Sequence, residues 1–315
     1  MRETTRLHLV LAFTAVCFGA FPVVGKLALA EIPPHVLAAL RVTAAATIFQ
    51  TLRHVTTGER IAGGRELSLF ALAALLGVVL NQGFFLLGLS RTSAIHTVLL
   101  VATIPAFSYA AGVVLGREAL LRGKVLGIAL AFAGVAVLLA ARDLGGAVGP
   151  QASLLGDLLV AANSLSYGVY LVVSRPLART YQPTTVVAWI FTFGVVVFVP
   201  LALAVPVAGR TLATLAWGSL SLKAWAALAW IIVFPTGIAY YLSSWALRRA
   251  DASLVAAYVF LQPVVTTVLA IPVLGERPGW LALVAAAAIF GGVTAIARAK
   301  PRPEPGGSGP SPRGV

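Results

Sequence analysis

The sequence predicts an all-α polytopic membrane protein with ten transmembrane helices, arranged as two inverted five-helix repeats with both termini cytoplasmic. Composition is the first observation behind this prediction. Of 315 residues, 59% are hydrophobic and only 10% are charged, and the mean hydropathy is +0.95. Soluble domains are about 45–50% apolar and about 25% charged. The other two observations are the lengths of the apolar segments and the distribution of basic residues between them.

A helix that crosses a bilayer needs about 20 mainly apolar residues, and ten segments satisfy this requirement. Their approximate ranges are 8–30, 35–52, 69–90, 93–115, 123–141, 154–174, 185–206, 224–247, 253–274 and 278–297. The first segment contains Lys26 and has no clear small-residue cleavage site after it, so we interpret it as a retained span and not as a signal peptide. The stretch 298–315, rich in Pro, Gly and Ser, is predicted to be a disordered tail.

The orientation follows from the Lys and Arg residues, which are enriched in cytoplasmic loops. Of the 23 basic residues, 16 fall in the two terminal segments and the alternate loops on the same predicted side of the membrane. The opposite side has five, and Lys26 and Arg41 lie within spans. Both termini are therefore predicted to be cytoplasmic. The same topology accounts for the net charge of +13 without a nucleic-acid partner.

An internal repeat relates the two halves of the chain. Arg91 and Pro105 recur 158 residues later as Arg249 and Pro263, each time before an apolar run that ends in Leu-Gly and an Arg/Glu pair. Five spans per repeat is an odd number, so the second copy is expected to enter the membrane from the opposite side. Chance similarity among Ala-, Val- and Leu-rich helices is the alternative explanation. The predicted repeats are 8–141 and 154–297.

Inverted repeats are typical of alternating-access carriers, whose substrate site lies near the middle of the membrane between the repeats. The residues that carry a closer resemblance are Phe18-Gly19, Lys26, Arg41, Leu87-Gly88-Leu89, Ser93-Ala94, Pro105, Arg117-Glu118, Ala246-Leu247, Asp251-Ala252, Pro263 and Glu276-Arg277. With these residues, the chain resembles a ten-helix carrier of the drug/metabolite transporter superfamily, of the EamA type, over about 8–297. It departs from the family pattern at Phe18, where Trp is common, and at Arg117-Glu118, where the order is usually reversed.

The resemblance implies secondary transport of a small metabolite outward across a bacterial inner membrane. An amino acid is the expected substrate, and the tyrosines favour an aromatic one. The expected partners are therefore this small molecule and the lipid bilayer, with no obligate protein partner. Three alternatives remain open: a passive channel or facilitator, an uptake permease for a drug, sugar or nucleotide-like solute, and a membrane scaffold without transport.

Polar groups at membrane depth are costly unless they pair or line a wet cavity, which makes them candidates for a binding site. Several amides and aromatic side chains fall near the middle of the predicted spans. The predicted substrate-binding residues are Asn81, Gln82, Phe85, His96, Asn163, Tyr167, Tyr240, Tyr258, Gln262 and Arg41. The alternative role for the amides is to join helices by hydrogen bonds, and Arg41 could instead extend toward the lipid headgroups.

Four prolines lie inside spans, and each removes the main-chain donor for the carbonyl four residues earlier. They are Pro22, Pro105, Pro235 and Pro263. Neighbouring helices or water must then satisfy these carbonyl groups. We predict that the four prolines are hinges, although static bends would produce the same pattern.

No carboxylate lies at the predicted mid-depth of a span. The sequence therefore lacks an Asp/Glu proton relay of the usual kind, and it lacks a ring of acids for a cationic drug. A neutral or zwitterionic solute fits better. No phosphate-binding loop or H-E-x-x-H zinc motif is present, so we expect no enzyme activity, cofactor or metal. The single Cys17 excludes an intrachain disulfide.

Overall fold

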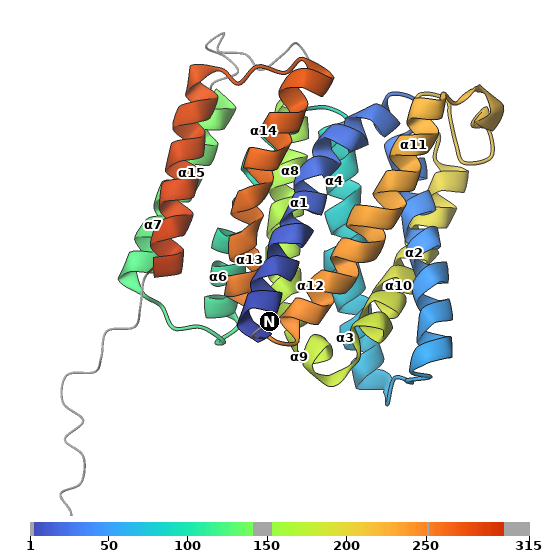
Figure 1. Ribbon diagram of the computed structural model, residues 1–315, viewed down its shortest axis with the longest axis horizontal. Helices are drawn as coiled ribbons and strands as arrows, with labels where there is room; N and C mark the ends of the chain where they lie inside the picture. The colour runs from blue at the N-terminus through green and yellow to red at the C-terminus, as the bar shows by residue number, and fades with distance from the viewer. Residues whose placement is uncertain (1–2, 141–152, 251, 299–315) are drawn as a thin grey trace, which may run out of the picture.

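The computed structural model describes residues 3–140, 153–250 and 252–298, and within these ranges it is a bundle of helices without a β-sheet (Figure 1). Nine of its helices are long and apolar enough to cross a membrane, and a further apolar helix covers Trp280–Ile296. The predicted all-α polytopic fold is therefore confirmed. The predicted tail 298–315 lies outside the described residues, apart from Arg298.

The observed spans agree with the predicted ranges to within five residues at each end. Six of them are single helices. They are α1 (Glu3–Leu29), α2 (Pro34–Thr56), α7 (Arg122–Ala140), α8 (Leu154–Val173), α15 (Trp280–Arg298) and the seventh span. The seventh span is α10 (Pro183–Ala204), and a short helix that the sequence analysis did not predict, α9 (Arg175–Thr180), precedes it.

The remaining four spans are interrupted. The third consists of α3 (Gly64–Ala74), η1 (Leu75–Leu80) and α4 (Asn81–Leu89), and the eighth of α11 (Leu222–Ile231), η3 (Ile232–Ala239) and α12 (Tyr240–Leu247). The fourth consists of α5 (Ala94–Val101) and α6 (Ile104–Val114), and the ninth of α13 (Ala252–Ala257), η4 (Tyr258–Phe260) and α14 (Leu261–Leu274). Both η1 and η3 are π-helical, a local widening that is frequent at functional sites.

These interruptions fall at equivalent places in the two halves. The π-helical segments begin at Leu75 and Ile232, which are 157 residues apart, and the broken spans resume just before Pro105 and Pro263. The ends match as well, because Gly116 and Gly275 both adopt left-handed backbone conformations, with φ of 66° and 68°. Glycine reaches such φ values without the steric cost of a side chain. The recurrence supports the predicted repeat.

One contact relates the directions of the fourth and ninth spans. Glu276, directly after α14, accepts hydrogen bonds from the main-chain N–H groups of Ala94 (2.7 Å) and Ile95 (3.0 Å) at the start of α5. The end of the ninth span therefore lies beside the beginning of the fourth. The start of α1 and the end of α15 lie on one side of the bundle (Figure 1). Which side faces the cytoplasm remains a prediction.

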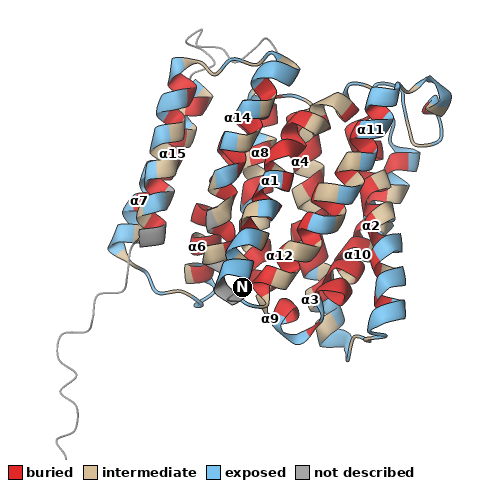
Figure 2. Ribbon diagram, viewed as in Figure 1, coloured by how far each residue is buried: buried red, intermediate tan, exposed pale blue. Residues whose placement is uncertain are grey.

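Burial is concentrated where the interrupted spans meet α1, α8 and α10, whereas the outer faces are exposed (Figure 2). At one edge, α7 and α15 form a pair that lies apart from the centre (Figure 1). Their main chains approach closely at Gly127 and Gly292, where a Cβ on either residue would lie 2.4 Å from the carbonyl oxygen of the other. Small residues permit such approach between membrane helices.

Candidate functional site

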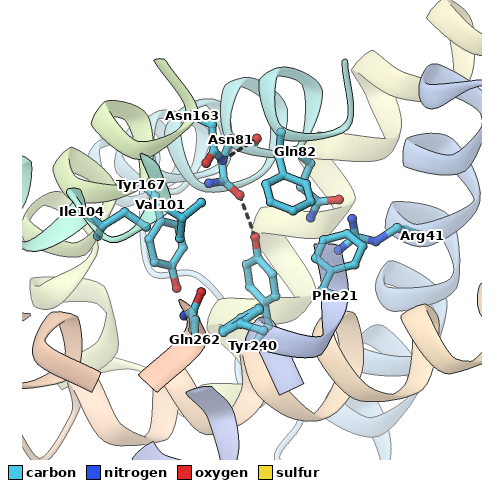
Figure 3. Close-up of a pocket in the computed structure, with 12 residues that line it drawn as sticks. Phe21, Arg41, Asn81, Gln82, Val101, Ile104, Asn163, Tyr167, Tyr240 and Gln262 are labelled. Atoms are coloured by element: carbon cyan, nitrogen blue, oxygen red, sulfur yellow. Dashed lines mark hydrogen bonds between the residues drawn. The ribbon is translucent and has the colours of Figure 1, made fainter. Parts of the chain in front are cut away.

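A cavity lies at the centre of the bundle and encloses about 500 Å³ of space between atoms, including its open mouth (Figure 3). Side chains from both halves of the chain line it. The lining residues are Phe18, Phe21, Arg41, Asn81, Gln82, Phe85, Val101, Ile104, Asn163, Tyr167, Tyr240 and Gln262. Three of these residues lie just after the interruptions of the third, eighth and ninth spans. They are Asn81, Tyr240 and Gln262.

Eight of the ten predicted site residues lie in this lining, and His96 and Tyr258 do not. The sequence analysis missed the apolar part of the lining. Phe21, Val101 and Ile104 have no sequence feature that separates them from other apolar residues in the same spans. Phe18 alone carried a signal, because it occupies the family position before Gly19 where Trp is common.

Three polar side chains hold the interrupted third span in place. The Asn163 side chain donates through Nδ2 to the main-chain carbonyl of Asn81 at 2.8 Å. The hydroxyl of Tyr240 lies 3.0 Å from the carbonyl oxygen of Gly77 and 3.1 Å from Oδ1 of Asn81. The hydroxyl of Ser166 donates to the carbonyl of Leu76 at 2.7 Å. Asn163 and Tyr240 thus join helices and also line the cavity, so the two roles considered from the sequence coexist.

Arg41 reaches the cavity from α2 and is 1% exposed. Its Nε donates to the hydroxyl of Thr236 in η3 at 2.8 Å. Its guanidinium lies 4.2 Å from the ring centre of Phe21, which is itself stacked on Phe85. The aromatic face favours a cation at this distance. Arg41 forms no ion pair with any residue that the structure describes.

Gln262 and Tyr167 form the opposite wall (Figure 3). Gln262 follows η4 and is 6% exposed, and its main chain lies against α1 at Gly19. The hydroxyl of Thr266, one turn further along α14, donates to the Gly19 carbonyl at 2.5 Å. The ninth span is therefore fixed to α1 beside the cavity.

His96 lies elsewhere, in a small buried cluster that joins α5 to α8. Its Nδ1 is 3.3 Å from Oδ2 of Asp157, and the hydroxyl of Thr92 donates to Oδ1 of Asp157 at 2.5 Å. The sequence showed the depth of His96 in its span but not the side of the helix that it occupies. The depth of His96 in its span was therefore not enough to predict whether it lines the cavity.

Tyr258 lines a second, smaller cavity next to the first. Phe18, Tyr167 and Gln262 belong to the linings of both. The Tyr258 hydroxyl is hydrogen-bonded to Nδ1 of His8 near the start of α1. This neighbouring space adjoins the central cavity and reaches Leu11 and Thr14, which lie nearer the start of α1 than Phe18 does.

The four predicted hinge prolines occupy different local settings. Pro22 lies inside the continuous helix α1, Pro235 inside η3, and Pro105 and Pro263 in the first turns of α6 and α14. At the break before Pro105, the carbonyl of Leu100 accepts from the hydroxyl of Ser164 at 3.0 Å, and from both the hydroxyl and the main-chain N–H of Thr103, at 2.6 Å and 3.1 Å. Movement at these prolines stays a prediction.

No acidic side chain is among the residues that line the cavity. In the described ranges, no group of three or more His, Cys, Asp and Glu residues is placed to hold a metal ion. The site can therefore offer amide, phenol and aromatic contacts together with one cation, Arg41. This set suits the binding of a small organic molecule.

Comparisons with known proteins place this architecture in a family. The model of the EamA-like transporter family matches residues 6–140 and 154–298. An uncharacterized transporter of Archaeoglobus fulgidus is 28% identical over 93% of this chain and 96% of its own length. A probable terminal-alkyne amino-acid exporter of Streptantibioticus cattleyicolor is 29% identical over 76% of each chain. A solved crystal structure, 21% identical over 92% of this chain and 96% of its own, has the same fold with a TM-score of 0.65. The predicted resemblance is thereby confirmed, and the chain belongs to the EamA-like transporter family.

Proposed function

We propose that this family member is a secondary transporter that exports a small metabolite, an amino acid, across a bacterial inner membrane by alternating access. The observation that carries the proposal is the central cavity, to which both halves of the chain contribute polar side chains. Carriers built from inverted repeats bind their substrate at such a place, next to interrupted helices. Asn81, Tyr240 and Gln262 meet this description.

Two further observations support the choice of carrier and substrate. A passive channel needs a continuous polar path, whereas the amides of the lining cluster in one central cavity together with the rings of Phe18, Phe21 and Phe85. Amino acids are proposed because one relative, 29% identical, is named an amino-acid exporter. The aromatic lining favours an apolar or aromatic side chain on the substrate. No enzyme activity or protein partner is part of the proposal.

The test uses the purified chain in proteoliposomes with labelled amino acids. Saturable flux and counterflow are expected of a carrier, whereas a channel gives flux without saturation or counterflow. Asn163→Leu is expected to reduce flux at least about tenfold, because it removes an amide from the cavity and its hydrogen bond to the third span. The absence of flux for every amino acid would reject the proposal.

The control is another amide in a span. Gln50 in α2 donates to Thr192 in α10 at 2.9 Å and does not line the cavity. Gln50→Leu removes a comparable hydrogen bond between two spans and should leave flux within about twofold of the unsubstituted protein, because it changes no cavity group. Equal losses in both variants would show that Asn163 acts only through helix packing.

A further inference from the structure

Arg41 combines three properties that are seldom found together. It is 1% exposed, its Nη1 atom has no hydrogen-bond partner, and it lines the central cavity. Arginine stays protonated in proteins, so this side chain brings a full positive charge into a membrane-spanning helix. Such buried charges are normally paired, because an unpaired one loses its hydration without compensation.

The neighbours of Arg41 do not compensate its charge. Thr236 and the ring of Phe21 offer a hydroxyl dipole and an aromatic face. The buried His96–Asp157 contact and the Lys124–Glu118 ion pair involve no residue of the cavity lining. The other basic residue inside a predicted span, Lys26, does not line the cavity and has the charge of Glu276 nearby. Arg41 is therefore the one cation in the described lining, and it lacks an anion.

A second donor lines the same cavity. Gln82 is 2% exposed, and neither atom of its amide forms a hydrogen bond of good geometry, although the hydroxyl of Tyr240 lies nearby. Figure 3 shows the Gln82 amide and the Arg41 guanidinium on the same side of the cavity, close to Phe21. Nη1 of Arg41 and Nε2 of Gln82 can therefore donate hydrogen bonds to one negatively charged group.

We propose that Arg41 and Gln82 bind the carboxylate of the transported molecule, so that the substrates of this protein are monocarboxylates, including amino acids. The planar guanidinium matches a carboxylate in geometry and forms strong charge-assisted hydrogen bonds with it. One negative charge balances the single cation, whereas a phosphate group would bring about two. This inference deepens the transport function proposed above and rests on it.

No other residue of the cavity lining requires a charged group on the substrate. An ammonium group would find only amide oxygens, phenols and aromatic faces, since no acidic residue belongs to the lining. The carboxylate is therefore the charged group that the site requires, and the amino group is tolerated. An acid without an amino group should bind, and an amine without the acid should not.

The experiment measures binding to the full-length purified protein through the rise in its apparent Tm. The probes are phenylalanine, 3-phenylpropanoate and phenylalaninamide, followed by leucine and leucinamide. Both acids of the first set and leucine are expected to raise the Tm, while the two amides bind about 10- to 100-fold more weakly. Amides that bind as well as the acids, or acids that do not bind at all, would overturn the inference.

Two variants separate a binding role from a structural one. Arg41→Gln should lose the preference for acids over amides, yet its apparent Tm without ligand should equal or exceed that of the unsubstituted protein, because an uncompensated charge has been removed. Arg53→Gln is the control: Arg53 is also buried, but it donates to Gln50 and to the carbonyl of Glu59. It should lower the Tm and keep the acid preference. An Arg41→Gln variant that keeps the acid preference and has a lower Tm, or an Arg53→Gln variant that loses the acid preference, would contradict the proposal.

Flux and binding can fail separately. Binding of acids without flux in proteoliposomes would refute the transport function and leave the carboxylate site standing. Saturable flux of acids and amides at equal rates would refute the carboxylate site and leave the transport function standing. Arg41→Lys keeps the charge and should retain part of the acid preference, which provides a test if Arg41→Gln does not fold.

Discussion

Gly19 of α1 lies directly against the main chain of Gln262 in α14: a Cβ at position 19 would be 2.9 Å from the Gln262 carbonyl oxygen. The other half contains the same arrangement. A Cβ on Gly168 of α8 would lie 2.7 Å from Cβ of Phe107 and 3.1 Å from the carbonyl oxygen of Ile104 in α6. Gln262 follows Ile104 by 158 residues, the spacing of the Arg91/Arg249 and Pro105/Pro263 pairs, and Gly168 follows Gly19 by 149.

Gly19→Ala and Gly168→Ala should therefore have similar effects. Each added methyl group would meet backbone or Cβ atoms at less than van der Waals distance, and overpacking of this kind costs about 1–3 kcal/mol. We expect both variants to lower the apparent Tm in detergent. Gly63→Ala is the control, because nothing lies within 4 Å of a Cβ at that position. An unchanged Tm for both helix variants would contradict the close packing.

The buried cluster around Asp157 leads to a second prediction. Asp157→Ala leaves His96 and Thr92 without their acceptor at a site where the His96 and Asp157 side chains are 3% and 0% exposed. Leaving a buried polar group without its hydrogen-bond partner costs about 1–3 kcal/mol. Thermal unfolding should show a large loss for Asp157→Ala and a smaller one for the double variant His96→Leu, Asp157→Leu. A double variant that is less stable than the single one would refute this pairing.

A third prediction concerns the break between α5 and α6. Ser164→Ala removes one of the two hydroxyl groups that donate to the Leu100 carbonyl, which also accepts from the main-chain N–H of Thr103 at 3.1 Å. The expected loss is about 1 kcal/mol, measured as a lower apparent Tm, since Thr103 still donates to the same carbonyl. Adding Thr103→Val should cost more than the two single changes combined, because the carbonyl then has neither hydroxyl. Strict additivity would argue against a shared acceptor.

A fourth prediction involves pH and a loop outside the spans. Glu31, between α1 and α2, accepts hydrogen bonds from the hydroxyl (2.5 Å) and the main-chain N–H (2.8 Å) of Ser221 before α11. These hydrogen bonds, first of all that from the hydroxyl, lower the pKa of the Glu31 carboxyl from its usual 4.5. A lowered folded-state pKa means that the stabilising contribution is fully present above about 4.5 and is lost as the pH falls through the lower value.

Hydrogen exchange at the start of α11 measures this contact. We expect the Ser221 amide to be protected at about pH 6 and to lose protection at an acidic pH below the lowered pKa of the Glu31 carboxyl. Glu31→Gln should remove the pH-dependent part of the protection and leave the other amides of α11 unaffected. Protection that does not change between the two pH values would show that this loop contact contributes little in solution.

The spans could be predicted from the sequence because a run of about twenty apolar residues is typical of a helix that crosses a membrane. Most of the cavity lining could also be predicted, since amides such as Asn81 and Gln262 are costly at membrane depth unless they are hydrogen-bonded or line a wet cavity. The π-helical segments could not be predicted, because their stability depends on donors such as Ser166 and Tyr240 from helices far away in the sequence. The sequence analysis placed His96 in the cavity because depth along a helix says nothing about the direction in which a side chain points.

The position of Arg41 has an electrical consequence. It is the eighth residue of α2, about 10 Å along the helix axis from its first residue, so its charge lies within the membrane field. Carrying one elementary charge across a full 100 mV potential requires about 2.3 kcal/mol of work. Any rearrangement that shifts α2 along the field is therefore coupled to voltage in the empty protein. A bound carboxylate without an amino group would neutralise that charge and remove the coupling to voltage, whereas a zwitterionic amino acid has no net charge and would leave the coupling in place.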